Sequence, residues 1–431
     1  MKAKSVFIML LGLLICLPSL VGAQDGQLIA ERTAGNNFGL GARAMGMGGA
    51  HIASVLDGTA LVYNPAALAK IRRIEFLGGI SHQNLTNNVD PGPGLPLQGL
   101  NERDQNNTRL NSINLSIPYP TYRGSLVFAF GLNRIKSFDK AFEIGADIPG
   151  GSYHGTEVET GSLYALSAGG GIDLSPKISL GASLNYYFGT DDYNWRLSTG
   201  GFADGLQPLY IDHIEDDYSA VSAKAGILIA YSKYLNIGAT VETPIQYDID
   251  EEYLLRTFDE GGVDIDGGRF SYDLWTPFTF GAGLGLNFNY LQLAADVNYA
   301  DWTQMEYKDN PALTSDNLFI QEYYRDVFSF SFGAEYLIPR LGLKLRAGYK
   351  YDPLPFRDIA FQQADDLMPI QGYDIINERD FVTFGFGYLI DRIMTLDVAF
   401  VLGGYKIQDN FTEVIEDYDL TRVFVTTGFR L

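Results

Sequence analysis

The sequence predicts an all-β fold, namely a 14-stranded antiparallel transmembrane β-barrel plugged by an N-terminal hatch segment. Three observations carry this prediction. Long segments alternate between apolar and polar residues with a period of two. Short turns and long polar loops separate these segments in strict alternation. A compact stretch rich in Gly and Ala precedes the first of them and belongs to none. The predicted parts are a signal peptide at 1–23, a hatch at 24–70 and a barrel at 71–431.

The first 23 residues have the pattern of a secretory signal peptide. Lys2 and Lys4 form a positive start, an apolar run follows, and Val21 and Ala23 are small residues at positions −3 and −1 of the expected cleavage site. The apolar run is too short to span a bilayer as a helix. The only cysteine, Cys16, lies within it, so we expect a mature chain without thiols or disulfides.

Composition narrows the class of protein. Without Lys2 and Lys4 the chain keeps 29 Lys and Arg against 52 Asp and Glu, a net charge of about −23. Such an acidic balance argues against nucleic acid as a partner. No apolar run after the signal peptide reaches the roughly 18 residues of a membrane helix. With 48 Gly and 54 Tyr and Phe, the exported chain is either a soluble β protein or an outer-membrane barrel.

The strands predicted from the alternation decide in favour of the barrel. In residues 178–188, Leu180, Leu184 and Phe188 share an apolar face, and Ser183 and Asn185 lie on the opposite face. An even number of strands, with tight turns at one rim and long loops at the other, is typical of a transmembrane barrel with both termini in the periplasm. The predicted strands lie near 72–84, 109–118, 122–136, 160–173, 176–189, 217–232, 234–246, 272–288, 290–302, 325–338, 341–352, 379–390, 393–406 and 417–431. The predicted long loops are 85–108, 137–159, 190–216, 247–271, 303–324, 353–378 and 407–416.

Barrel size explains why a plug is expected. Side chains fill a barrel of about eight strands, and barrels of about sixteen or more leave a water channel. A 14-stranded lumen would therefore leak unless a segment occupied it. Residues 24–70 are small, weakly charged and partly apolar, which opposes a disordered tail. Gly46, Gly48 and Gly49 permit positive φ and a close approach to the wall.

Two stretches resemble a known family. "GARAMGMGGAHIASVLDGTALVYNPAALA", from residue 41, resembles the hatch of FadL-type long-chain fatty acid transporters of the outer membrane. Asn64, Pro65 and Ala66 correspond to the NPA motif of that family. "GSLVFAFGLNRIKSFDKAF", residues 124–142, is similar to the third strand of FadL-like proteins and its following loop.

The resemblance implies a passive outer-membrane channel for hydrophobic molecules such as long-chain fatty acids. In the family, extracellular loops capture the ligand, the hatch moves, and the ligand leaves sideways beside a kink in the third strand. By this resemblance, Gly131 and Asn133 are assigned to the lateral opening. Phe138 and Phe142 are assigned to ligand capture, and Arg134 and Lys136 are expected to bind a carboxylate. The implied partners are the hydrophobic ligand, outer-membrane lipid and lipopolysaccharide. The resemblance further implies a monomeric barrel that needs no cofactor.

Other functions are weaker or stay open. Acidic clusters in the loops match no calcium-loop spacing, and the four histidines form no metal pair, so we predict no metal site. Ser81 and His82 are adjacent in a strand and point to opposite faces, which disfavours an esterase. A plug argues against an open porin. A FadL-like scaffold barrel of the PorV type, which holds secreted proteins with its loops, remains the alternative. The sequence also leaves open the ligand, the pocket residues and calcium binding by the loops.

Overall fold

The computed structural model describes residues 39–90, 102–148, 151–200, 207–259, 262–308, 310, 313, 316–356, 373–391, 393–409 and 414–431. The predicted signal peptide and residues 24–38 of the predicted hatch lie outside the described residues, and both assignments remain predictions.

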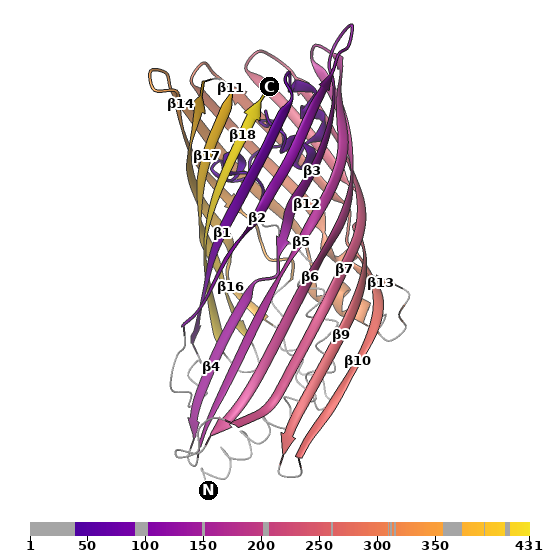
Figure 1. Ribbon diagram of the computed structural model, residues 1–431, viewed down its shortest axis with the longest axis vertical. Coiled ribbons are helices and arrows are strands. Elements are labelled where there is room, and N and C mark those ends of the chain that lie inside the picture. The colour runs from indigo at the N-terminus through magenta and orange to yellow at the C-terminus, as the bar shows by residue number, and fades with distance from the viewer. Residues whose placement is uncertain are drawn as a thin grey trace.

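The described strands form one antiparallel sheet that closes on itself (Figure 1). Closure is made by β1 and β18, which stay in register from the pair Glu75–Arg430 to the pair Asp90–Ile415. This pairing of the first strand with the last closes the sheet into a barrel, as a membrane-spanning sheet requires. The strands are β1 (Glu75–Asp90), β2 (Glu102–Tyr119), β3 (Leu126–Ser137), β4 (Lys140–Ile148), β5 (Gly151–Ser175), β6 (Ile178–Gly200), β7 (Gln207–Ala230), β8 (Leu235–Glu242), β9 (Gln246–Asp259), β10 (Gly262–Trp275), β11 (Thr279–Asn287), β12 (Leu291–Asp301), β13 (Glu306–Lys308), β14 (Asp326–Ile338), β15 (Leu343–Tyr351), β16 (Tyr373–Ile390), β17 (Met394–Asp409) and β18 (Ile415–Arg430).

These segments make fourteen barrel strands, which confirms the predicted fold class. Four barrel strands are each interrupted once, so that β3 continues into β4, β8 into β9, β10 into β11, and β12 into β13. Both members of the pair β8 and β9, for example, lie beside β7.

The helical segments are short. They are α2 (Ala42–Met45), α3 (Ala60–Tyr63), η1 (Pro65–Lys70), η2 (Trp302–Gln304) and α4 (Asp316–Tyr323). None of the helices in the described ranges has both the length and the apolar character needed to cross a membrane.

The wall is apolar outside and polar inside. Along β6, Leu184 is 69% exposed, whereas its neighbours Ser183 and Asn185 are buried. On β14, Phe330 and Phe332 are exposed and Ser331 between them is buried. A soluble sandwich would bury the aromatic rings instead, so this inversion indicates a barrel surrounded by lipid. The predicted faces of these strands are confirmed.

The two rims differ in length. Tight turns join β5 to β6, β7 to β8 and β14 to β15 at the rim where the C-terminus lies, at the top of Figure 1; we call this the short-turn rim. At the opposite rim, β4 to β7, β9 and β10 extend well beyond the rest of the wall. The long loops predicted at 137–159, 190–216 and 247–271 are therefore mostly wrong, because paired strands occupy most of these residues. We call this end the extended rim.

Candidate functional site

The described part of the hatch, residues 39–70, lies inside the barrel near the short-turn rim, as the indigo coil in Figure 1 shows. Tight turns fold it, and Gly48 and Gly49 have φ values of 66° and 78°, in the left-handed region that favours glycine. The expectation of positive φ fails at Gly46, whose φ is −65°. A Cβ there would lie 3.4 Å from Arg346 of the wall, so close approach is the feature that Gly46 provides.

Glycines of the wall form the seat of the hatch. A Cβ at Gly181 would overlap the backbone of Pro65, and one at Gly348 would overlap the backbone of Met47 and Gly48. Gly181 and Gly348 lie on β6 and β15, far apart around the wall, so the hatch contacts much of the inner circumference. The wall glycines whose Cβ would come within 3.0 Å of a hatch atom are Gly169, Gly171, Gly181, Gly226, Gly238, Gly281, Gly283, Gly285, Gly333 and Gly348.

The Asn64-Pro65-Ala66 motif fastens the hatch to itself and to the wall. Asn64 is fully buried, and its Nδ2 donates to the carbonyl oxygens of Ile52 at 2.9 Å and Ile227 of β7 at 3.2 Å. Its Oδ1 accepts from the Ala66 backbone N–H at 3.1 Å, which caps η1. Pro65 is the first residue of η1, where its missing N–H costs no hydrogen bond.

We expect Asn64→Ala to loosen the hatch without opening the wall. The substitution leaves the Ile52 carbonyl and the Ala66 N–H buried without this partner, at roughly 1–3 kcal/mol for each group, and removes the contact with the Ile227 carbonyl of the wall. Hydrogen–deuterium exchange of residues 50–68 should become at least about ten-fold faster, since about 1.4 kcal/mol corresponds to a factor of ten. Asn84→Ala, which removes an exposed hydrogen bond to Asn106, serves as the control. Equal exchange in both variants would contradict the anchoring role.

A buried ion network joins the hatch to the wall at the short-turn rim. Arg43 of the hatch donates to Glu335 of β14 at 3.1 Å and to Gln292 of β12 at 2.9 Å. Glu335 also binds Lys344 and Arg346 of β15, both at 2.8 Å. Because these charges are largely removed from water, each depends on its partners. Sequence alternation placed Glu335 and Arg346 on the polar face of their strands but gave no sign that they meet Arg43.

His51 stabilises the fold of the hatch as a neutral side chain. Burial lowers its pKa to about 4, so the imidazole carries no charge at neutral pH. Its Nδ1 lies 3.1 Å from the Ser54 hydroxyl, and its ring meets the Tyr63 ring edge to face at 5.2 Å. The ring therefore joins two turns of the hatch.

A cavity of about 240 Å³ lies between the hatch and the wall, toward the extended rim. Leu40, Met45, Ile52 and Tyr63 of the hatch line it, together with residues from several strands. Its charged lining includes the ion pairs Lys224–Glu242 at 3.2 Å and Lys350–Asp352 at 3.0 Å. The remaining charged side chains that line it are Arg134, Lys136 and Asp296.

The wall is incomplete beside this cavity, between β2 and the strand formed by β3 and β4. The ladder between β2 and β3 ends at the pair Ser112–Asn133, and no pairing of β4 with β2 occurs among the described strands. Beyond that point side chains span the seam: Arg109 contacts Asp139 at 3.0 Å, and Arg103 contacts Glu143 at 2.9 Å. We call this gap in backbone pairing the β2–β3 seam.

Gly131 and Asn133, assigned to the lateral opening by the resemblance, lie just before the seam. Gly131 is paired regularly on both sides, with Asn114 and with Ser167, so the backbone is not irregular at this position. The register shift lies instead between Arg134 and Lys136. Asn133 ends the ladder, and its amide exchanges two hydrogen bonds with Asn114, at 2.8 and 3.2 Å.

Arg134 and Lys136 both line the cavity. Arg134 is fully buried and paired with Asp139 at 3.2 Å, with further hydrogen bonds to Ser137 and Ser162. Lys136 is 4% exposed, and its Nζ lies 5.7 Å from the centre of the Tyr247 ring. Both cations therefore face the lumen and not the outer rim of the barrel. The register shift between them accounts for this, because it breaks the regular alternation of inward and outward residues along β3.

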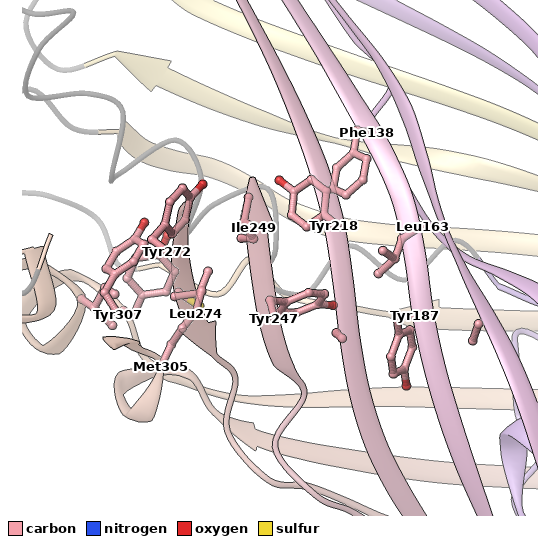
Figure 2. Packing of buried hydrophobic residues seen from close by; sticks show 14 residues of the cluster. Phe138, Leu163, Tyr187, Tyr218, Tyr247, Ile249, Tyr272, Leu274, Met305 and Tyr307 are labelled. Atoms are coloured by element: carbon pink, nitrogen blue, oxygen red, sulfur yellow. The ribbon is translucent and has the colours of Figure 1, made fainter. Parts of the chain in front are cut away.

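Phe138 and Phe142 are not exposed loop residues as expected. Phe138 lies between β3 and β4, is buried, and stacks on Tyr218 at 5.1 Å. Phe142 lies in β4, half-buried, 6.2 Å from the Trp195 ring. Figure 2 shows Phe138 within a tyrosine-rich apolar cluster on the inner face of the wall. Its buried members are Phe138, Leu163, Ala165, Tyr187, Tyr218, Ala220, Tyr247, Ile249, Tyr272, Leu274, Met305, Tyr307, Ile320 and Tyr324.

Residues considered for other chemistry are not brought together. Ser81 is buried, and the exposed His82 beside it contacts Thr108 at 2.8 Å, on the opposite face of β1. His154 lies 3.0 Å from Glu143 at the seam. Within the described ranges, no group of three His, Cys, Asp or Glu side chains could hold a metal ion.

A closed barrel that is apolar outside, with a plug in its lumen and a cavity behind the plug, defines the class of outer-membrane channel proteins. The chain belongs to the family described as outer membrane protein transport protein (OMPP1/FadL/TodX), which matches residues 19–414. This family transports hydrophobic compounds across the outer membrane. No curated protein sequence matches the chain.

Solved structures of similar fold agree. A FadL homologue of Pseudomonas aeruginosa is 15% identical, with a TM-score of 0.66, over 92% of this chain and 100% of that one. The toluene transporter TodX of Pseudomonas putida is 16% identical, with a TM-score of 0.62, over 91% and 99%. The monoaromatic hydrocarbon channel CymD is 16% identical, with a TM-score of 0.58, over 92% and 99%. At these identities the likeness concerns the fold.

Proposed function

We propose that this protein is a passive outer-membrane channel that carries hydrophobic molecules such as long-chain fatty acids into the periplasm. The observation that carries the proposal is the cavity between hatch and wall, whose lining includes Arg134, Ile135 and Lys136 beside the β2–β3 seam. In this proposal the extended rim is extracellular, the short-turn rim is periplasmic, and residues 1–23 are the signal peptide that exports the chain. The barrel acts as a monomer in contact with lipid and lipopolysaccharide.

Capture takes place at the tyrosine-rich cluster. Its rings lie on the inner face of the wall, and two of its members, Ala165 of β5 and Tyr187 of β6, also line the cavity beside the hatch. An acyl chain or aromatic ring that inserts among these buried apolar side chains leaves water, and this favours its capture. Phe138 thus serves capture from the interior of the barrel.

Arg134 and Lys136 meet the carboxylate of a fatty acid. Both are buried in the lumen, line the cavity and lie where β3 leaves β2. A buried cation attracts a carboxylate more strongly than a solvated one, because the local dielectric constant is low. A single aromatic ring also suits a cavity of about 240 Å³, since benzene binds in an apolar cavity of roughly 150 Å³.

The hatch rearranges and the ligand leaves sideways through the β2–β3 seam. At the seam a few side-chain contacts, among them Arg109–Asp139 and Arg103–Glu143, take the place of a backbone ladder. Side chains can swing aside without breaking strand pairing. The internal cavity favours this transport function over the PorV-type scaffold, which needs a protein-binding outer surface and no cavity.

Deleting Arg134 is expected to close the seam. The deletion leaves Ile135 opposite Tyr164, so the register shift before Lys136 disappears and β3 can continue its ladder. Uptake of labelled oleate by cells that lack other routes should fall at least ten-fold relative to Arg134→Ala. That substitution removes the same side chain and keeps the extra residue, so the difference between the two variants measures the register shift.

Surface expression and heat-modifiable mobility in gels check that both variants fold. If the two variants take up oleate equally well, exit through this seam is wrong. If the wild type takes up no hydrophobic compound at all, the transport function is wrong and the scaffold alternative replaces it.

A further inference from the structure

A second interruption of the wall lies away from the β2–β3 seam, beside β7. The ladder between neighbouring barrel strands stops at Glu242–Thr279 and resumes at Gln246–Trp275. Three residues on each strand, 243–245 and 276–278, lie between these pairs. Both segments carry a proline after a threonine, Pro244 and Pro277, which have no N–H to donate to a ladder. The pairing of β7 with the same segment is also irregular, because only residues 222 and 223 of β7 lie opposite 243–245, between the pairs Lys224–Glu242 and Val221–Gln246. We call the interruption on both sides of residues 243–245 the β7–β8 break.

Threonine hydroxyls hold the break together. The Ala223 N–H of β7 donates to Thr243 Oγ1 at 3.0 Å, and the Ile245 N–H donates to Thr276 Oγ1 at 3.0 Å. Two backbone hydrogen bonds, Thr243 N–H to the Ala223 carbonyl and Thr276 N–H to the Ile245 carbonyl, complete the contact. Half of these bonds depend on side-chain rotamers, so the wall can separate here with fewer backbone changes than in a regular ladder.

The internal cavity reaches the inner side of this break. Glu242, Thr243, Ile245, Thr276 and Pro277 all line the cavity that lies against the hatch. The Lys224–Glu242 ion pair lies at the same place, and Tyr187 and Ser222 also hydrogen-bond to Glu242. The charge of Glu242 is thus already matched within the wall.

An open groove of about 470 Å³ lies on the outer side of the same break. A Cβ added to Gly181 or Gly226 would meet the hatch, so these positions face inward. Because successive residues of a strand face opposite sides, the neighbouring Ala182 and Ala225 face outward. Leu184, Val241 and Phe278 border the groove, and Leu184 and Phe278 are exposed to lipid. Thr243 and Lys224 line both the groove and the cavity, so the two spaces are separated by little more than one layer of wall atoms.

We propose that the β7–β8 break is a second lateral portal, through which uncharged hydrophobic molecules pass between the cavity and the surrounding lipid. This inference rests on the proposed transport function. The β2–β3 seam has Arg109, Arg134 and Lys136 beside it and suits a carboxylate. At the β7–β8 break, the charges of Lys224 and Glu242 on the inner side neutralise each other, and the side chains on the outer side are apolar. A carboxylate therefore gains no new ion pair there, and an aromatic hydrocarbon needs none.

A reversible cross-link tests the portal. The mature chain is expected to lack cysteine, so the double variant Ala223→Cys and Thr243→Cys introduces the only pair. Their backbones are hydrogen-bonded to each other, which brings the two positions within reach of a disulfide. The control is Ala334→Cys with Ala347→Cys, a directly opposed, outward-facing pair in the regular ladder between β14 and β15.

Uptake of labelled toluene and of labelled oleate is measured in oxidised and reduced cells. Oxidising the Ala223/Thr243 pair should lower toluene uptake at least three-fold relative to the same variant in its reduced form. Oleate uptake should differ by no more than about 25% between these two forms. The Ala334/Ala347 pair should change neither. Unchanged toluene uptake in the oxidised pair, verified as cross-linked by mass spectrometry, overturns the portal while the channel function stands. Uptake of neither probe by the wild type overturns both.

Discussion

Replacing Gly181 by valine is expected to turn the plugged barrel into an open pore. A Cβ at this position overlaps the Pro65 carbonyl and the Ala66 nitrogen, which are backbone atoms in η1 and cannot rotate away. Valine itself suits a strand, so the wall should still form. The hatch must then leave its seat, and a lumen of fourteen strands is too wide for the remaining side chains to fill.

The measurement is single-channel conductance in planar bilayers, with sensitivity of whole cells to a large hydrophilic antibiotic as a second readout. We expect steady porin-like openings and at least a four-fold lower inhibitory concentration. Gly78→Val is the matched control, because a Cβ at Gly78 meets only the Phe76 ring, at an ordinary 3.9 Å. A closed, fully folded Gly181→Val barrel would show that the hatch tolerates displacement within the lumen, contrary to a fitted seat.

Replacing Glu335 by glutamine is expected to have the second largest effect, on the stability of the hatch. Glu335 is the shared partner of Arg43, Lys344 and Arg346. Without the charge of Glu335, Arg43 still pairs with Asp57 and Arg346 still pairs with Asp397. Three cations then face two carboxylates, so an excess of positive charge stays buried. Breaking a buried ion pair by removing one partner typically costs about 3–5 kcal/mol.

Hydrogen exchange of residues 42–50 measures the free energy of hatch opening, which should fall by this amount. Glu252→Gln is the control. It removes one partner of the Arg269–Glu252 pair, whose side chains are 77% and 53% exposed, and exposed pairs contribute little. Equal protection in Glu335→Gln and Glu252→Gln would mean that the glycine seat and Asn64, not the ion network, hold the hatch.

The membrane-spanning part of the wall could be predicted from sequence because lipid imposes one rule on every strand. Leu180 and Leu184 must face out and Ser179 and Ser183 must face in, which gives a clear period of two. Beyond the lipid that rule ends. On β9 the pattern is inverted, because Asp248 and Asp250 face water on the outside while Tyr247 and Ile249 are buried on the inside. The apolar outer face is missing there, so paired strands looked like loops.

The seat of the hatch could not be predicted because it joins residues that are distant in sequence. Gly226 appears as one of many glycines in a strand until Asn64, more than 150 residues earlier, is placed against it. The register shift after Arg134 is hidden for a similar reason, since a shift is a relation to β5 and not a property of β3. Motif resemblance located the hatch and the third strand, but only the wall shows why those residues are small.

The strand that closes the barrel also contacts the hatch. Ala42 donates its N–H to Thr426 of β18 at 2.9 Å, and Arg430 at the end of β18 pairs with Glu75, which in turn accepts from Gly58 of the hatch. The strand that closes the wall is therefore also a strand that holds the plug. Separation of β18 from β1 would loosen the hatch together with the barrel, so the last strand ties the integrity of the wall to that of its plug.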